Sequence, residues 1–298
     1  MNAVSYSKIT YSDSSYPLKL KNYSGMPASL YFKGALPDPS KKSVAIVGAR
    51  KCSSYGRQAA EMFARSLAEH GVQIISGLAF GIDSAAHEGC LKAGGATFAV
   101  MGCGIEHIYP RSNAQLYRRI IENNGGIISE FEPSSPPLAY HFPIRNRIIS
   151  ALSDAVVIIE AKKKSGSLIT ASYALEQGVQ VYALPGKIND KLSCGTNDLI
   201  WQGAIPALSP EQILTDLGVN TKNSTSKKEE SSSSSLKREY THDELKLLEL
   251  LSSAPLSLSE LCYMCNMSTA AVSGALLSLE LDGSIYSPFA GSYARTDR

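Results

Sequence analysis

Residues 43–50 read Ser43-Val44-Ala45-Ile46-Val47-Gly48-Ala49-Arg50, and this stretch decides the fold. Its apolar residues are consecutive rather than alternating, which is typical of a strand covered on both faces of a sheet. The glycine that follows permits a tight turn, as the first strand of an α/β domain requires. The stretch therefore predicts a buried strand that leads into a turn and a helix.

Similar apolar runs recur along the chain, and helical patterns separate them. The expected strands are 43–47, 73–76, 97–101, 126–129, 155–160 and 180–183, and the expected helices are 56–70, 83–93, 113–123, 145–152 and 167–177. Gly71 and Gly178 stand where helices are expected to end. This alternation predicts an α/β fold with an extended Rossmann-like, doubly wound and mostly parallel sheet.

The segment 218–240 separates two domains. It contains the run Ser231–Ser235 between charged residues, and it is too polar to offset its ordering entropy, so we expect a flexible linker. Helical patterns at 243–251, 259–265 and 269–281 precede a short hairpin pattern, which together predict a small winged-helix domain at 241–298. The body is 43–217, and residues 1–42 are expected to form an extended lead-in that packs on it.

The net charge of the 298-residue chain is only +2, which at first disfavours a nucleic-acid partner. The charge is unevenly distributed, however, at +4 for 1–217, +2 for 218–240 and −4 for 241–298. The near-neutral total is therefore a cancellation between a mildly basic body and an acidic C-terminal domain.

The cellular setting is constrained by what the sequence lacks. No signal peptide is visible at the N-terminus, and no apolar run is long enough to span a bilayer. Six dispersed cysteines indicate reduced thiols rather than a disulfide framework. We expect a cytoplasmic protein without a membrane segment. The close pair Cys262 and Cys265 has no second ligand pair nearby, so no metal site is expected.

Ligands of open α/β sheets bind beyond the carboxyl ends of the strands, and these positions are unusual here. The loops after five expected strands carry glycine or serine, and arginine or lysine stands in two of them. Glycine lets backbone N–H groups approach an anion, and helix N-termini add partial positive charge. The sequence therefore predicts an edge that binds phosphate groups.

Several common phosphate-binding and catalytic sites are disfavoured. The loop 48–56 lacks the G-x-G-x-x-G pattern, and no acidic residue ends the second strand to hold a ribose, so a standard NAD site is not expected. No P-loop, no G-x-S-x-G and no histidine spacing of a metal site is present. We expect no cofactor.

The segment 141–147 reads His-Phe-Pro-Ile-Arg-Asn-Arg. We expect Arg145, Asn146 and Arg147 in the first turn of a helix, where cations are unfavourable unless an anion is bound. Phe142 before that helix could be a hydrophobic staple or a platform on which a nucleobase stacks. Phosphate-binding loops, arginines and an exposed aromatic ring together favour single-stranded nucleic acid over a mononucleotide.

A set of motifs in this order resembles the DNA-processing protein A family (DprA, also called Smf). The motifs are Val47-Gly48-Ala49-Arg50, Ser76-Gly77-Leu78-Ala79-Phe80-Gly81-Ile82-Asp83 with Ala86-His87, Phe142-Pro143-Ile144-Arg145-Asn146-Arg147, Glu160-Ala161, Ser165-Gly166-Ser167-Leu168-Ile169-Thr170, Pro185-Gly186 and Gly195-Thr196-Asn197. They run through the whole body, and their combined specificity is high although each alone would be weak.

The resemblance implies a protein that binds single-stranded DNA and forms a homodimer through its Rossmann domain. It also implies a role in natural transformation, in which the protein protects incoming DNA and loads the RecA recombinase onto it. It implies no catalysis. The DNA-binding candidates are Gly48, Arg50, Ser76, Gly77, Gly81, Phe142, Arg145, Asn146, Arg147, Lys164, Ser165, Gly166, Ser167 and Thr170. Longer family members carry a helical SAM-like domain before the Rossmann domain, which the short segment 1–42 implies is missing or reduced here.

Two other functions were weighed. A Rossmann-like nucleotide phosphoribohydrolase should open its catalytic helix with Pro-Gly-Gly-x-Gly-Thr-x-x-Glu, whereas Ser165–Thr170 has no glutamate in that register. The second alternative function is a protein-interaction module that binds phosphate only incidentally. For the winged helix, the third helix 269–281 carries no lysine or arginine. Because DNA readers show a basic stripe, we expect this domain to contact a protein rather than duplex DNA.

Overall fold

The computed structural model describes residues 6–219, 240–251, 255–289 and 292–296. The chain separates into two compact units, Met1–Lys227 and Lys228–Arg298. The point of division lies within the expected linker 218–240, of which 220–239 fall outside the described residues. The flexibility of that linker stays a prediction.

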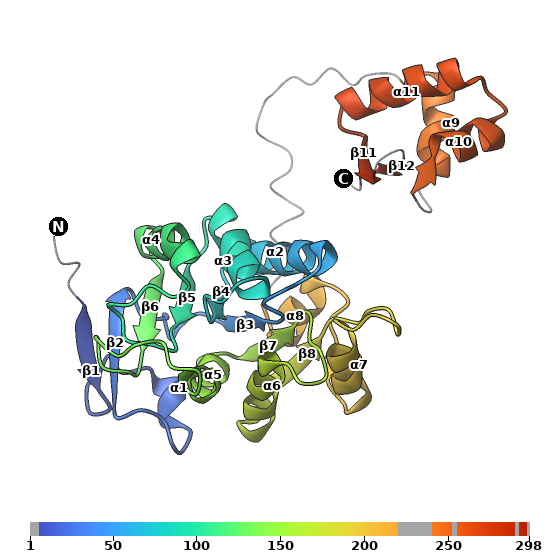
Figure 1. Ribbon diagram of the computed structural model, residues 1–298. Coiled ribbons are helices and arrows are strands. Elements are labelled where there is room, and N and C mark those ends of the chain that lie inside the picture. Colours follow the sequence, from blue (N-terminus) through green and yellow to red (C-terminus); the bar gives the residue numbers. More distant parts are fainter. Residues whose placement is uncertain (1–5, 220–239, 252–254, 290–291, 297–298) are drawn as a thin grey trace. The chain divides into compact units, whose positions relative to one another are not determined.

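The first unit is built on one nine-stranded sheet with the order β1-β2-β6-β5-β4-β3-β7-β8-β9 (Figure 1). The seven strands from β6 to β9 are parallel to one another. Their bounds are β3 Ser43–Val47, β4 Gln73–Ser76, β5 Thr97–Val100, β6 Gly126–Ser129, β7 Ala155–Ile158, β8 Gln180–Ala183 and β9 Ile205–Pro206. The predicted Rossmann-like α/β fold is confirmed, with the expected strands at 97–101 and 155–160 ending earlier than the sequence indicates.

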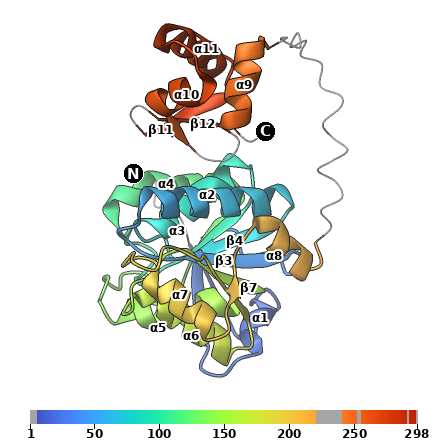
Figure 2. The same ribbon diagram turned by 90° about the vertical axis from the view of Figure 1, so that its right-hand side faces the viewer.

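Helices cover both faces of this sheet (Figure 2). Their bounds are α2 Ser54–Glu69, α3 Ile82–Lys92, α4 Ala114–Glu122, α5 His141–Ala151, α6 Gly166–Glu176, α7 Cys194–Trp201 and α8 Pro210–Asp216. Side chains of β3 alternate between the two layers: Ala45 and Val47 join the core with α5 and α6, whereas Val44 and Ile46 join the core with α2 and α3. This two-sided burial is the physical reason for the continuous apolar run.

The N-terminal segment, expected as an extended lead-in that packs on the body, adds two strands to the sheet itself. β1 (Ser7–Thr10) pairs antiparallel with β2 (Ser29–Gly34), and β2 pairs antiparallel with β6. Between them, α1 (Leu18–Lys21) buries Leu20 completely, as β2 buries Leu30. Apolar residues in this segment are spaced irregularly among tyrosines and lysines, so the sequence shows no helix or strand periodicity. The strands form because β2 pairs with β6.

The start of α5 also differs from the prediction. The helix begins at His141, four residues before the expected start at 145. Pro143 lies in its first turn, where the missing N–H would have no helical partner in any case. Arg145, Asn146 and Arg147 therefore occupy the second turn, and the argument that they oppose the helix dipole in the first turn is wrong.

The second unit has three helices and a small sheet. α9 (His242–Leu250), α10 (Leu258–Cys265) and α11 (Thr269–Leu281) surround a core that includes Leu247, Leu261 and Leu276. β10 (Leu256–Ser257), β12 (Ser292–Arg295) and β11 (Ile285–Phe289) form an antiparallel three-stranded sheet in that order. Capping boxes at Thr241 and Ser257 fix the starts of the first two helices.

Candidate nucleic-acid interface

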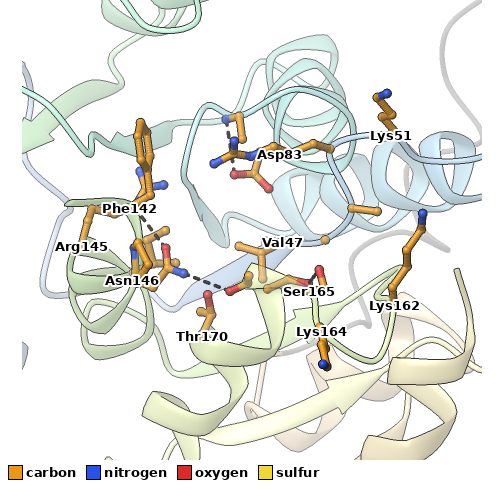
Figure 3. A pocket seen from close by; sticks show the side chains of 18 of the residues that line it. Val47, Lys51, Asp83, Phe142, Arg145, Asn146, Lys162, Lys164, Ser165 and Thr170 are labelled. Atoms are coloured by element: carbon orange, nitrogen blue, oxygen red, sulfur yellow. Dashed lines mark hydrogen bonds between the residues drawn. The ribbon is translucent and has the colours of Figure 1, made fainter. Parts of the chain in front are cut away.

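A pocket of about 430 Å³ lies beyond the carboxyl ends of β3 and β7. In the sheet, β3 lies between β4 on one side and β7 on the other, and the strand order reverses direction between β3 and β7. The pocket therefore lies at the topological switch point, where such sheets bind ligands. The pocket is lined by Val47, Gly48, Ala49, Arg50, Lys51, Ala79, Asp83, Ala139, Phe142, Pro143, Arg145, Asn146, Ile149, Lys162, Lys164, Ser165, Gly166, Ser167, Thr170 and Leu192 (Figure 3).

The N-terminus of α6 forms one wall of the pocket. Ser165 precedes the helix, and its side chain caps none of the first N–H groups, although its carbonyl accepts the N–H of Leu168 at 3.1 Å. The hydroxyls of Ser165 and Ser167 lie 2.8 Å apart, so both are grouped at this helix end. The first N–H groups of a helix, hydroxyls and the positive end of the helix dipole are groups of the kind that bind anions.

Lysine side chains surround this wall. Lys51, Lys162 and Lys164 come from the loops after β3 and β7, and all three are exposed. Figure 3 shows them on the side of the pocket away from Phe142. No ion pair with another described residue holds these ammonium groups. They are available to neutralise phosphate charge.

The opposite wall is the first half of α5, which presents an aromatic ring and an amide. The Phe142 ring is half-buried, and the Arg50 guanidinium lies over it, 5.3 Å from the ring centroid. A Cβ on Gly102 would lie 2.6 Å from Cδ1 of Phe142, so the glycine is required for the ring to pack there. Asn146 donates from Nδ2 to the Gly166 carbonyl at 3.2 Å, which joins the two walls.

The floor of the pocket is a buried pair of opposite charges, Asp83 and Arg145. The guanidinium of Arg145 donates to the Gly77 carbonyl at 3.1 Å and to the Val100 carbonyl. Burial lowers the pKa of Arg145 to about 10, although the nearby Asp83 opposes this shift. Burial likewise raises the pKa of Asp83, against the influence of Arg145 and of backbone hydrogen bonds.

Asp83 also accepts hydrogen bonds from backbone N–H groups that the sequence analysis predicts to bind phosphate. Its carboxylate accepts hydrogen bonds from the N–H of Gly77 at 3.0 Å and of Ala79 at 3.4 Å, and the backbone of Gly48 also acts to lower its pKa. An internal carboxylate therefore fills the nest at the ends of β3 and β4. The start of α6 is the other helix N-terminus at this edge, and Asp83 makes no hydrogen bond to it.

Most of the sequence-predicted residues converge on the pocket, and four do not line it. The lining residues are Gly48, Arg50, Phe142, Arg145, Asn146, Lys164, Ser165, Gly166, Ser167 and Thr170. Of the others, Ser76 is buried and donates its hydroxyl to the Ile46 carbonyl at 2.7 Å. Gly77 is held by Asp83. Gly81 has φ +78°, and a Cβ there would lie 2.3 Å from the Ala49 carbonyl oxygen, so its role is to fit two loops together.

Arg147 points to a different partner. Its guanidinium donates to both carboxylate oxygens of Glu130, at 2.6 and 2.7 Å, and to the Gly25 carbonyl at 3.0 Å. This bidentate pair ties α5 to the loop after β6 and to the segment between α1 and β2. The structure does not bring Arg147 to the pocket.

Sequence reasoning missed Lys51, Lys162 and Asp83 as lining residues. The two lysines belong to basic clusters that the charge pattern already marks, so proximity to strand ends could have found them. Asp83 gave no such signal, because its contacts join loops that are far apart in the sequence. Among the described residues, no group of three or more His, Cys, Asp or Glu side chains could hold a metal ion. No helix in the described ranges has the length and apolarity that a membrane crossing needs.

The fold and the pocket define a class: a Rossmann-like protein whose switch point combines a basic anion site with an aromatic wall. The comparisons make this specific. The model of the family DNA recombination-mediator protein A matches residues 7–218, and that of the DprA winged helix domain matches 230–287. The chain belongs to the DprA/Smf family.

Relatives from several bacteria are similar over the body of the chain. Protein Smf of Escherichia coli is 46% identical over 202 residues, which are 68% of this chain and 54% of that protein. DNA processing protein DprA of Bacillus subtilis is 42% identical over 210 residues, 70% of each chain. The match thus spans about half of the E. coli protein's length.

Two solved structures have the same fold. DprA from Streptococcus pneumoniae aligns with a TM-score of 0.67 at 40% identity, over 71% of this chain and 74% of that one. DprA from Helicobacter pylori, described for its single-stranded DNA binding mode, aligns with a TM-score of 0.63 at 32% identity, over 71% of this chain and 95% of that one.

Proposed function

We propose that this protein binds single-stranded DNA in the switch-point pocket. The observation that carries the proposal is the combination, within one pocket, of a helix N-terminus that Ser165 does not cap, lysines that form no ion pair with any described residue, and an aromatic ring beside Arg50. Phosphate groups would bind at Ser165–Ser167 and the lysines, and a base would stack on Phe142. The single-stranded DNA binding described for the H. pylori relative supports this assignment.

Twelve of the residues that line the pocket are proposed to contact DNA. They are Gly48, Arg50, Lys51, Phe142, Arg145, Asn146, Lys162, Lys164, Ser165, Gly166, Ser167 and Thr170. Ser76, Gly77, Gly81 and Arg147 hold the surrounding loops and helices in place through the contacts described above. Asp83 acts as a positioning residue, because its carboxylate joins the loops after β3 and β4.

Fluorescence anisotropy with labelled oligo-dT tests the proposal. We expect binding that weakens steeply as salt rises, since neutralising phosphates releases counterions. A matched duplex should bind more weakly, because bases in a duplex cannot stack on the pocket wall. Equal affinity for duplex and single strand, or an affinity that does not respond to salt, would contradict the proposal.

The substitution Phe142→Ala tests the stacking role within that pocket. Loss of one stacked base should cost about 1–3 kcal/mol of binding free energy. The measurement is the same oligo-dT titration, with thermal unfolding recorded for both proteins to show that the fold is retained. An unchanged affinity in a folded variant would refute the stacking role.

We further propose that the protein protects incoming DNA and loads the RecA recombinase onto it during natural transformation, in the cytoplasm and without catalysis of its own. Family membership and the names of the DNA-processing relatives support this role. The test is nuclease resistance of bound oligo-dT, together with RecA filament formation on single-stranded DNA with and without the protein. Nuclease digestion or filament formation at the same rate in both cases would contradict it.

A homodimer through the first unit is part of the proposal. The sheet ends at β9, a two-residue edge strand, and nearby Trp201 and Leu208 are 87% and 73% exposed. Exposed apolar side chains at a sheet edge favour association. Light scattering of the wild type and of Trp201→Glu tests this: a dimer that the variant disrupts is expected, and a monomeric wild type would exclude it.

A further inference from the structure

The pocket is too small for a long strand, so a bound strand must leave it across the rim. Its volume is about 430 Å³, within the range of small-molecule sites. Single-strand-binding proteins usually continue their contact with successive bases on further aromatic side chains. An exposed ring at the rim that continues the surface of Phe142 would provide such a contact.

Tyr109 meets that description. Its ring centroid lies 5.4 Å from that of Phe142, with 45° between the ring planes. It follows β5 in the chain and does not line the pocket itself, yet it is 38% exposed. The two rings thus form one aromatic surface that runs from the pocket wall to solvent. Arg50, at the Phe142 ring, keeps positive charge beside this surface.

The loop that carries Tyr109 is held in place before any ligand binds. The Gly104 N–H donates to the Ser135 carbonyl at 2.8 Å, and the Glu106 N–H donates to the Pro133 carbonyl at 3.1 Å. On the other side of Tyr109, Asn113 donates from Nδ2 to the Leu78 carbonyl at 2.9 Å. A ring fixed in this way loses little freedom when a base stacks on it, which favours binding.

We propose that Tyr109 is a second stacking site, on which the first base outside the pocket rests, so that the strand leaves the pocket over the loop after β5. The inference rests on the proposed function, because it extends the same bound strand. It differs in making a length-dependent claim: Tyr109 should matter only for strands that are long enough to reach beyond the pocket.

Oligo-dT of increasing length, titrated against wild type and variants, tests this. Tyr109→Ala should lose about fivefold or more in affinity for long oligo-dT, the lower end of one stacked base. For the shortest oligo-dT that wild type still binds, the affinity of Tyr109→Ala should equal that of wild type. Tyr109→Phe should behave as wild type at every length, because the ring remains.

The matched control is Tyr11→Ala. Tyr11 is 49% exposed and its ring lies 5.5 Å from that of Tyr16, but it belongs to the segment between β1 and α1, which contributes no lining residue. This control should leave affinity unchanged at all lengths. Thermal unfolding of each variant confirms that it is folded.

The outcomes separate the two proposals. Wild-type affinity of Tyr109→Ala at all lengths would overturn the second stacking site and leave the pocket proposal standing. An equal loss at all lengths would also overturn it, since Tyr109 would then act by supporting Phe142. A loss in Tyr109→Phe as large as in Tyr109→Ala would assign the effect to the hydroxyl rather than to stacking. No binding of any oligo-dT by wild type would overturn the proposed function itself.

Discussion

Arg145 and Arg147 are two residues apart on α5, yet the fold gives them opposite environments. Arg145 is buried beneath the pocket beside Asp83, whereas Arg147 forms a bidentate pair with Glu130. Neither guanidinium is a freely exposed cation. At the residue scale, both Arg50 and the buried Arg145 lie at the Phe142 ring, but Arg50, in the loop that directly follows β3, is the exposed one.

Arg50→Ala should therefore weaken oligo-dT binding much more than Arg147→Ala. Loss of a hydrogen-bonded charge contact is worth about 1.5–3 kcal/mol, and we expect Arg50→Ala to lose that much binding free energy. Arg147→Ala should instead lower the free energy of unfolding, because it leaves Glu130 without its partner. Paired titrations and urea denaturation of both variants measure the difference, and the reverse ranking of affinities would contradict it.

His87, in α3, supplies a prediction about pH. Its Nδ1 lies 2.7 Å from Oγ1 of Thr97, and because that hydroxyl donates to the Ile74 carbonyl, Nδ1 is the protonated nitrogen. Nε2 is buried without a hydrogen-bond partner among the described residues. Burial lowers the pKa of His87 from 6.5 to about 3.

The unfolded chain therefore takes up this proton first as pH falls. As pH falls from 6.5 to about 3, His87 should progressively lower the free energy of unfolding, by up to about 1.4 kcal/mol per pH unit. His87→Gln should show a correspondingly shallower fall in unfolding free energy, measured by urea denaturation across this range. The half-buried His107 provides the control substitution, His107→Gln, and parallel wild-type and His87→Gln profiles would argue against the prediction.

At the scale of elements, periodicity predicts well those strands and helices that have one clear pattern. The strands β3, β4, β6 and β8 have the expected bounds. The pattern failed where tertiary contacts supply the regularity: β1, α1 and β2 become ordered because β2 pairs with β6 and Leu20 packs into the core. It also failed at α5, where a proline in the first turn hid the helix start.

The short helix α1 allows a matched test of this N-terminal segment. Leu20 is fully buried, while Leu18 on the same helix is 61% exposed. Leu20→Ala should cost about 2–5 kcal/mol of unfolding free energy, and Leu18→Ala should stay within about 0.5 kcal/mol of wild type. Urea denaturation measures both. Equal, small effects would mean that the segment does not contribute to the stability of the body.

At the scale of the whole molecule, charge is divided between the two units. Residues 1–217 carry 21 Lys and Arg against 17 Asp and Glu, whereas 241–298 carry 3 against 7. Helix α11 has no basic residue. The acidic unit thus lacks the basic stripe of duplex DNA readers, which favours the proposal that it contacts a protein.

Removal of residues 219–298 should consequently leave the affinity for oligo-dT within about threefold of the full chain. The physical reason is that every lining residue of the pocket lies in the first unit, which has its own hydrophobic cores; a threefold change is about 0.7 kcal/mol. Anisotropy titrations of both proteins at the same salt concentration provide the comparison. A large loss on truncation would instead place part of the DNA interface in the second unit.

The sequence by itself determined the α/β class, the three helices of the second unit and the family, because these depend on local periodicity and on motifs that stand in order along the chain. It also named ten of the twenty residues that line the pocket. The hydrogen-bond partners of the predicted residues were settled by the tertiary structure alone. The N–H group of Gly77 bonds to Asp83, and Arg147 bonds to Glu130, because side chains distant in sequence reach them first. Hydrogen-bond partners are set by spatial proximity and burial, which no local pattern encodes.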